Sequence, residues 1–382
     1  MSNIPKFILT ILIPVFLSLS SAGQILQTST VKKIDSIVSG YMTANKMIGV
    51  SIGIVKDGKI YLTKGYGTAE IDKVKPIDSL TNFLTCSVTK LFTATAIMQL
   101  SEQGKIDISK KLIFYLPGFK MKDERYKDIT IEHLLTHTSG LFWDMNLKHS
   151  PNDSSSLRKL VYSLDDKILA FTPGTKFNPI ETYSNAAYDI LGYLVQTISG
   201  EQYEDYITDN ILVKANMPHS SIDYNKIPAE RRSSPHILKG KVVKAGGIYT
   251  ENAEHSPSGN LNSCSTDLCN WMLHNLNIYN NANSFKGALQ NSTLQNMWTT
   301  RHTAPQNKKI SIGLGWWITK SDDLGKYYWH VGDNPGFSAT LMIFPEHNFG
   351  ITILCNGMYA EQIVWNKIPF DIINLFKDEW KN

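Results

Sequence analysis

The segments with strand character lie at the two ends of this chain, and the segments with helical character lie between them. Near the start, two β-rich runs flank Asp57-Gly58 in IGVSIGIVKDGKIYLTKGYG, a strong signal for a tight hairpin. After residue 310 the strand-like runs return as GLGWWIT, KYYWHVG, SATLMIFP and FGITILCNG. The simplest fold is α+β (an α/β sandwich), with one antiparallel sheet built from both chain ends.

The helical segments divide between the flanks of that sheet and a separate subdomain. Residues 31–45 suit an amphipathic helix, 86–103 suit a buried helix, and EQIVWNKIPFDIINLFKD suits a closing helix. We therefore expect the sheet part at about 24–80 and 305–382, flanked by the terminal helices. A mainly helical subdomain is inserted at about 81–304, and an active site is expected in the crevice between the two parts.

Residues 1–23 have the pattern of a secretory signal peptide. Lys6 precedes an apolar run over 7–19, and small residues follow before the predicted cut. The alternative is a single membrane anchor, but Pro14 interrupts the run, which is also short for a membrane span. We expect export to the periplasm or the medium, and a mature domain at 24–382 without a membrane span.

Charge and cysteine usage exclude several classes of function. The chain has 38 Lys and Arg against 34 Asp and Glu, scattered without a basic tract, so we expect no nucleic-acid or lipid-surface partner. None of the four cysteines has C-x-x-C spacing, so neither a zinc knuckle nor a thioredoxin-type motif is indicated. Cysteine pairing and oligomeric state stay open.

The stretch CSVTKLFTATAIM, residues 86–98, sets two polar groups at the start of an apolar helix. A lysine buried there is costly unless it is paired or has lost its charge. Ser87 and Lys90 are three residues apart and share a helix face. Free N–H groups in the first turn favour a developing negative charge, and a neutral lysine can take the serine proton. The alternative is a solvated helix end.

Two later segments carry further candidate residues. In ETYSNAAYDILGYL, Tyr183 can relay protons if nearby cations lower its pKa, and Asn185 offers an amide to a substrate; the alternative is a buried tyrosine with a Ser/Asn cap. In KYYWHVGDNPGFSATLMIF, we expect a strand that ends at His330-Val-Gly332, followed by a turn. Gly332 at a sheet edge lets a ligand approach closely; the alternative is a plain hairpin.

Other matches to catalytic patterns are rejected on their context. Ser51 in GVSIG lies inside a strand rather than on the tight strand-to-helix turn that G-x-S-x-G requires. The second S-x-x-K is in a polar region and the second Y-x-N in an Asn-rich loop: Ser156 to Lys159, and Tyr279 to Asn281. His133 and His137 lack an HExxH pattern, so we expect structural or loop-orienting roles rather than a zinc site.

Taken in order, S-x-x-K, Y-x-N and the third motif on a late strand resemble the serine β-lactamase and penicillin-binding-protein superfamily. The similar branch is that of the class C β-lactamases with the related esterases and D-amino-acid peptidases. The flanks SVTKLFTATAIMQL, ITIEHLLTHTSGL, FTPGTKF, GLGWW and PGFS are also similar to that branch. The resemblance implies a β-lactamase/transpeptidase-like fold and an exported serine hydrolase of a small-molecule or peptide substrate, without metal or organic cofactor.

The resemblance also implies a role for each motif residue. Ser87 attacks a carbonyl and becomes acylated, and Lys90 takes its proton. Tyr183 protonates the leaving group and then activates the deacylating water. Asn185 holds the acyl side chain, and the backbone N–H groups of Ser87 and Asp333 form the oxyanion hole.

The third motif departs from the usual K-T-G of β-lactamases and D,D-peptidases. His330-Val331-Gly332, followed by Asp333, replaces a fixed cation with a group that is largely neutral near pH 7. Recognition of a penicillin-type carboxylate is therefore expected to be weaker, and H-x-G versions look like those of D-aminopeptidases and carboxylesterases. NPIE, residues 178–181, stands where relatives are often shorter, which puts the substrate in doubt: an ester, a D-amino-acid peptide or a β-lactam. The alternative function is a non-hydrolytic or slowly acylating sensor that binds penicillin or cell-wall peptides.

Overall fold

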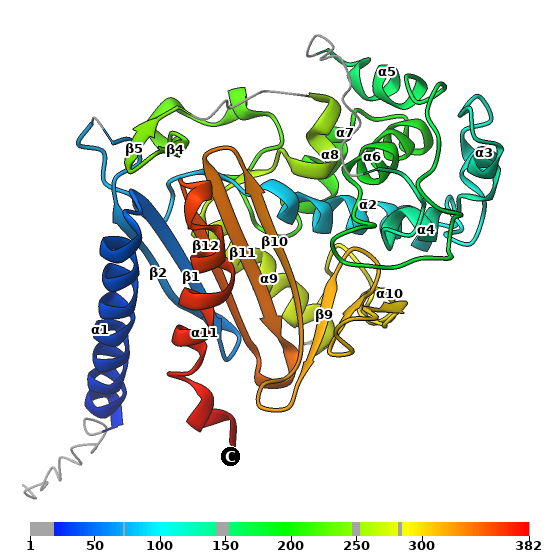
Figure 1. The fold of residues 1–382 in the computed structure, drawn as a ribbon. Helices are drawn as coiled ribbons and strands as arrows, with labels where there is room; N and C mark the ends of the chain where they lie inside the picture. Colours follow the sequence, from blue (N-terminus) through cyan, green and yellow to red (C-terminus); the bar gives the residue numbers. More distant parts are fainter. Residues whose placement is uncertain (1–18, 72, 143–152, 247–252, 282–284, 382) are drawn as a thin grey trace, which may run out of the picture.

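A computed structural model describes residues 19–71, 73–142, 153–246, 253–281 and 285–381. Its centre is an eight-stranded antiparallel sheet with the order β2-β1-β12-β11-β10-β9-β8-β7 (Figure 1). In chain order the strands are β1 Gly49–Lys56, β2 Lys59–Gly67, β7 His302–Thr303, β8 Ile310–Ile312, β9 Trp317–Ser321, β10 Gly325–Asn334, β11 Phe337–Phe344 and β12 Phe349–Cys355. Most of the predicted signal peptide lies outside the described residues.

The two ends of the chain meet inside this sheet. Strand β1 pairs with β12 from Val50 opposite Cys355 to Lys56 opposite Phe349. The hairpin between β1 and β2 turns at Asp57 and Gly58, whose φ angles are +53° and +75°. Positive φ at both turn residues matches the right-handed twist of the strands, so the Asp-Gly pair does what its sequence predicts. The expected sheet from both chain ends is therefore confirmed.

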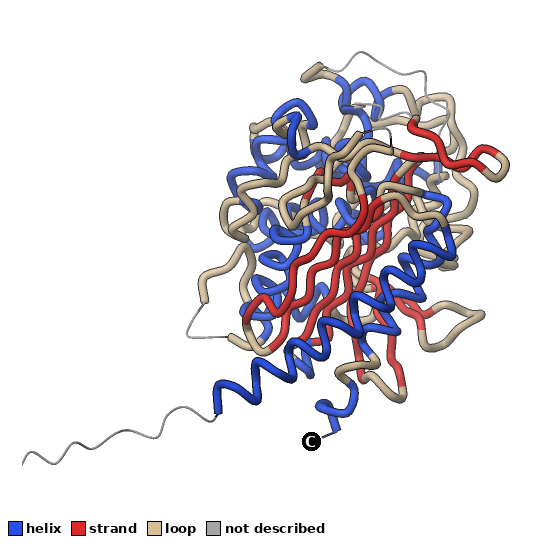
Figure 2. Tube along the Cα trace, turned by 90° about the vertical axis from the view of Figure 1, so that its left-hand side faces the viewer, coloured by secondary structure: helices blue, strands red, loops and turns tan. Residues whose placement is uncertain are grey.

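Helices cover both faces of the sheet, as Figures 1 and 2 show. On one face α1 (Leu19–Asn45) packs against α11 (Ile368–Ile373), and their apolar side chains meet those of β1 and β12. On the other face lies α9 (Ser265–Tyr279). Its close approach requires a small residue, because a Cβ at Gly53 would lie 2.6 Å from Cys269 Sγ.

The inserted block stands beside the end of β10 and is mostly helical (Figure 1). Its core is continuous with the α9 face of the sheet, where the Phe92 and Trp271 rings stack 4.4 Å apart. Besides helices it contains two small sheets, β3–β6 and β4–β5. The elements are β3 Phe83–Leu84, α2 Thr89–Glu102, α3 Leu112–Tyr115, α4 Ile131–Leu135, α5 Ser156–Tyr162, α6 Asn185–Ser199, α7 Tyr203–Ile207, β4 His236–Lys239, β5 Val242–Ala245, α8 Ser256–Gly259, β6 Asn262–Ser263 and α10 Asn291–Met297.

The terminal helices differ from their predicted extents. In the described residues helix α1 covers Leu19–Asn45, so it extends well before residue 31, where the predicted helix starts. The predicted closing helix is divided into a wide π turn at Ile363–Lys367 and α11, because Pro369 has no N–H to continue a regular ladder. Within the described residues, no helix combines the length and the apolar character needed to cross a membrane.

Candidate active site

Ser87 lies in a short 3-10 turn, Cys86–Val88, that joins β3 to α2. The residue before it, Cys86, has φ of +52°, a left-handed conformation that is uncommon for a residue other than glycine. Both neighbours of Ser87 are buried, whereas Ser87 itself is partly exposed. The turn therefore presents the serine hydroxyl at the surface of an otherwise buried segment.

Lys90 lies one turn further, in a helix whose residues 89–100 are all buried. Its side chain is fully buried, and Nζ lies 3.1 Å from Ser87 Oγ, 2.7 Å from Asn185 Oδ1 and 2.7 Å from the Ser258 carbonyl oxygen. Burial lowers the pKa of Lys90 to about 7, although the charge of Asp189 acts in the opposite direction. A substantial fraction of Lys90 is therefore neutral near pH 7.

Tyr183 precedes α6, whose N-cap Ser184 accepts a hydrogen bond from the Ala187 N–H. The Tyr183 side chain is buried, its hydroxyl is hydrogen-bonded to Ser87, and Lys90 Nζ lies 4.9 Å from its ring centroid. Burial raises the pKa of Tyr183, so its phenol stays protonated at neutral pH. Nearby cations therefore do not lower this pKa: desolvation raises it most, and the charges of Asp333 and Asp189 act in the same direction.

An aromatic wall holds the Tyr183 ring in place. The His137 imidazole stacks on it with centroids 4.3 Å apart, and the Trp317 indole is nearly parallel to it at 6.5 Å. His137 Nδ1 also accepts a hydrogen bond from the Ser184 N–H. Burial holds the pKa of His137 well below its ordinary value, so the ring is neutral. His133 closes a capping box with Thr130 at the start of α4. These contacts give both histidines the loop-orienting positions expected from the sequence.

The third motif runs beside the nucleophile on β10. His330 is buried, which lowers its pKa to about 3, so this position carries a neutral imidazole. Gly332 touches the turn of Ser87, because an added Cβ would lie 2.7 Å from the Ser87 nitrogen. The strand does not end at Gly332 as predicted: it continues through Asn334, and Asp333 pairs with Ser338 of β11. Ladder pairing with β11 extends the strand, and burial raises the pKa of Asp333.

The structure thus brings Ser87, Lys90, Tyr183 and Asn185 into contact and places β10 beside them. The rejected patterns lie elsewhere. Ser51 is inside β1 and bonds to Ser265 Oγ. Ser156 opens the short helix α5 rather than lying in a loop, but Lys159 there is an exposed partner of Asp153. The second Y-x-N lies at the end of α9, with Tyr279 as its last residue.

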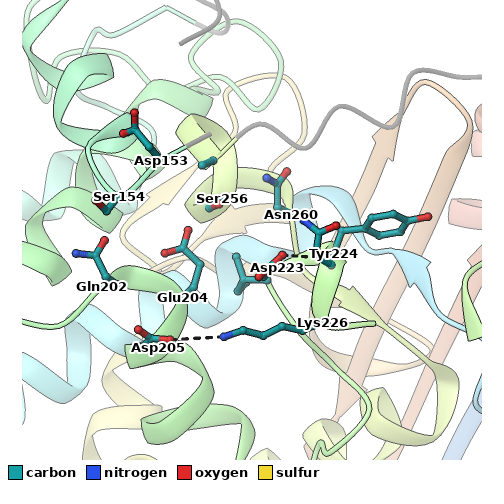
Figure 3. Close-up of a pocket in the computed structure, with 13 residues that line it drawn as sticks. Asp153, Ser154, Gln202, Glu204, Asp205, Asp223, Tyr224, Lys226, Ser256 and Asn260 are labelled. Atoms are coloured by element: carbon teal, nitrogen blue, oxygen red, sulfur yellow. Dashed lines mark hydrogen bonds and ion pairs between the residues drawn. The ribbon is translucent and has the colours of Figure 1, made fainter. Parts of the chain in front are cut away.

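A separate hollow of about 350 Å³ lies in the inserted block, with Ser256 of α8 among the residues that line it (Figure 3). Most of the residues that line it are of polar types, and they include four carboxylates and the Lys226 ammonium, which lies 3.6 Å from Asp205. The lining residues include none of Ser87, Lys90 and Tyr183, so this hollow is not the candidate active site. In the part of the chain that the structure describes, no three His, Cys, Asp or Glu side chains are grouped to hold a metal ion.

Comparison with known proteins assigns this chain to a family. The family model described as Beta-lactamase matches residues 34–367. The chain belongs to the beta-lactamase family. Members of this family are generally serine hydrolases. The expected resemblance and the expected β-lactamase-like fold are both confirmed.

Individual relatives of this beta-lactamase-family protein are distant. "Protein flp" of Staphylococcus aureus (strain MRSA252) is 29% identical over 327 residues, which cover 85% of this chain and 62% of that protein. The chain thus spans less than two thirds of that relative. "Penicillin-binding protein 4*" of Bacillus subtilis (strain 168) is 26% identical over 318 residues, 78% of this chain and 66% of that protein. A solved class C beta-lactamase superposes with a TM-score of 0.75 at 20% identity, over 91% of this chain and 96% of the other.

Three residues of the candidate site in this beta-lactamase-family protein were not predicted from the sequence. The Ser258 carbonyl binds Lys90, but a backbone oxygen has no side-chain signature. Nothing in the segment GLGWW indicated that the Trp317 ring would lie near that of Tyr183. Asp189 had a readable signal, because a lone carboxylate in the apolar run AAYDILGYL, four residues after Asn185, is on the same helix face.

Proposed function

We propose that this protein is an exported serine hydrolase that transfers an acyl group through Ser87. The observation that carries this proposal is the set of partners around Lys90 Nζ. Asn185 Oδ1 and the Ser258 carbonyl can only accept hydrogen bonds, so they take the two N–H groups of a neutral amine. The lone pair is then left for the third partner, the Ser87 hydroxyl at 3.1 Å.

In acylation, Ser87 Oγ bonds to the carbonyl carbon of the substrate while its proton passes to Lys90. The protonated Tyr183 gives its proton to the leaving oxygen or nitrogen as the bond to the carbonyl carbon breaks. In deacylation the Tyr183 oxygen takes a proton from water, the resulting hydroxide attacks the acyl-enzyme, and Ser87 leaves and regains its proton. The backbone N–H groups of Ser87 and Asp333 are proposed to stabilise the oxyanion.

The charge of the third motif affects which substrates the site can bind. His330 is neutral, and Asp333 is a carboxyl group rather than a cation, so neither attracts a substrate carboxylate. We therefore propose that neutral esters and D-amino-acid amides are turned over better than β-lactams. A slowly acylating sensor is the second candidate, and the neutral His330 in place of a lysine is the observation that favours it.

The test is hydrolysis of a panel by the purified protein and its Ser87→Ala variant: p-nitrophenyl acetate and butyrate, a D-alanyl anilide, a D-Ala-D-Ala peptide and nitrocefin. We expect Ser87-dependent turnover of an ester or the anilide. Ser156→Ala, the serine of the other S-x-x-K, is the matched control and should retain activity. A stable adduct by mass spectrometry without turnover would favour the sensor, and undiminished turnover by Ser87→Ala would overturn the mechanism. N-terminal sequencing of protein recovered outside the cytoplasm tests the export.

A further inference from the structure

A buried carboxylate that acts on the charge of Lys90 is paired with a partly exposed imidazole. Asp189 Oδ2 lies 2.7 Å from His255 Nδ1. The Asp189 side chain is completely buried, whereas 32% of the His255 side chain is exposed. Burying a carboxylate costs free energy unless it is paired, so the contact with His255 is needed to keep Asp189 in the interior. The acyl-transfer steps above use neither residue.

The two partners belong to elements that both hold Lys90. Asp189 lies on α6, one turn after Asn185, whose Oδ1 accepts a hydrogen bond from Lys90. His255 ends a 3-10 turn, Ala253–His255, and directly precedes α8, which carries the Ser258 carbonyl. The Asp189–His255 contact therefore joins α6 to α8. It fixes the spacing between the two oxygen atoms that orient the Lys90 amine.

The packing of α6 on α8 leaves little room for another arrangement. A Cβ at Gly192, on α6, would lie 2.0 Å from Pro257 Cγ on α8. The Pro257 carbonyl accepts a hydrogen bond from Thr93 on α2, the helix of Lys90. Through Pro257 and Thr93, a shift of α6 relative to α8 therefore reaches the helix that carries Lys90.

We propose that Asp189 and His255 are a positioning pair for Lys90, and that the Asp189 charge sets the pH range in which Lys90 works as a base. This inference rests on the proposed acyl transfer through Ser87. Neither residue touches the substrate in this scheme, so both act only through the lysine.

The charges around Lys90 allow the sign of the effect to be stated. The titratable groups that act on it or lie against it come from the turn of Ser87, β10, α6 and the surrounding loops. They are Cys86, Asp189, Asp333, Tyr183, Tyr188, His137 and His330. The groups that act on or bond to Asp189 are Lys90, His255, Tyr183 and Tyr203. Burial lowers the pKa of Lys90, and among the charges that raise it Asp189 has the largest effect. Removing that charge lowers the Lys90 pKa further.

The test is the pH profile of kcat/KM for the preferred ester in Asp189→Asn, which keeps the size of the side chain. Because Lys90 must be neutral to take a proton, its titration forms the acid limb of the profile. We expect this limb to move to lower pH by about one unit. Asp267→Asn is the matched control: Asp267 is equally buried and bonds to Ser220 and the His219 N–H. That variant should lose stability without moving the limb.

A second variant covers the case in which Asp189→Asn does not fold. His255→Phe removes the hydrogen bond and should lower kcat about ten-fold with little change in KM, and His255→Asn, which restores a donor, should recover much of that loss. An unmoved acid limb in folded Asp189→Asn, or full activity in His255→Phe, would overturn the positioning pair. If either result is found while Ser87→Ala is inactive, the positioning pair fails and the proposed function stands. If Ser87→Ala keeps its activity, the proposed function itself fails.

Discussion

Gly332→Ala is the substitution that most directly probes how β10 meets the nucleophile. Gly332 has no left-handed φ, so alanine can adopt its backbone, and the only obstacle is space. The added Cβ would lie 2.4 Å from the Thr85 carbonyl oxygen and 2.7 Å from the Ser87 nitrogen. These are backbone atoms that cannot rotate away. To reach even a tight 3.0 Å contact, the strand and the turn must separate by about 0.6 Å.

That displacement acts on the geometry of the reaction. A shift approaching 1 Å at the reacting groups lowers the rate by about 100-fold, so we expect kcat to fall by about 10- to 100-fold. The assay is steady-state hydrolysis of the preferred ester, with thermal unfolding measured on the same sample. Undiminished kcat would refute the placement of β10 against Ser87.

Two matched glycine variants separate this effect from general damage. Gly53→Ala creates a similar clash, 2.6 Å from Cys269 Sγ, but at the α9 face of the sheet. It should lower the melting temperature and leave kcat of the folded protein near wild type. Gly40→Ala meets nothing within 4 Å in α1 and should be neutral or slightly stabilising, by up to about 1 kcal/mol. If Gly53→Ala lowered kcat as much as Gly332→Ala, the loss would not be specific to the site.

Three further predictions follow from the protonation states. The kcat/KM of wild type should rise with pH through about 7, because Lys90 is a base only when neutral; a flat profile from about pH 5 to 9 would contradict this. Lys90→Arg keeps the positive charge but cannot release a proton, so kcat should fall at least about 100-fold, and near-normal turnover would rule out the lysine as base. His330→Lys returns a cation to the third motif and should lower the KM for nitrocefin several-fold relative to a neutral ester; an unchanged ratio would show that this position does not select for carboxylates.

Local signals predicted the parts of the fold and site that depend on a few neighbouring residues. The Asp57-Gly58 turn and the spacing of Ser87 and Lys90 are of this kind, because a turn type or a helix face is set within four residues. The contact of Tyr183 and Asn185 with that helix spans about 95 residues and was expected only through the resemblance.

The features that could not be predicted depend on tertiary surroundings. The Ser258 carbonyl is one such feature, and the extension of β10 through Asp333 is another, because pairing with Ser338 overrides the turn signal of Asp-Asn-Pro-Gly. The pKa of Tyr183 is a third. Its direction is set mainly by burial, and a sequence shows the charged residues without the depth of burial.

Burial also explains why serine, lysine and tyrosine can work together in one small space. It lowers the pKa of Lys90 to about 7 and raises that of Tyr183, so near pH 7 a substantial fraction of the protein has both groups neutral before the reaction. His137 and His330 are neutral for the same reason. In that fraction, charge appears mainly in the transition state, as the lysine gains a proton and the substrate oxygen becomes negative, and burial of Lys90 strengthens that attraction. A fixed cation at position 330 would improve binding of anionic substrates, but it would also oppose protonation of Lys90. The His330→Lys variant should therefore bind nitrocefin better while the acid limb of its profile moves to lower pH, and a limb that moved upward would contradict this account of the site.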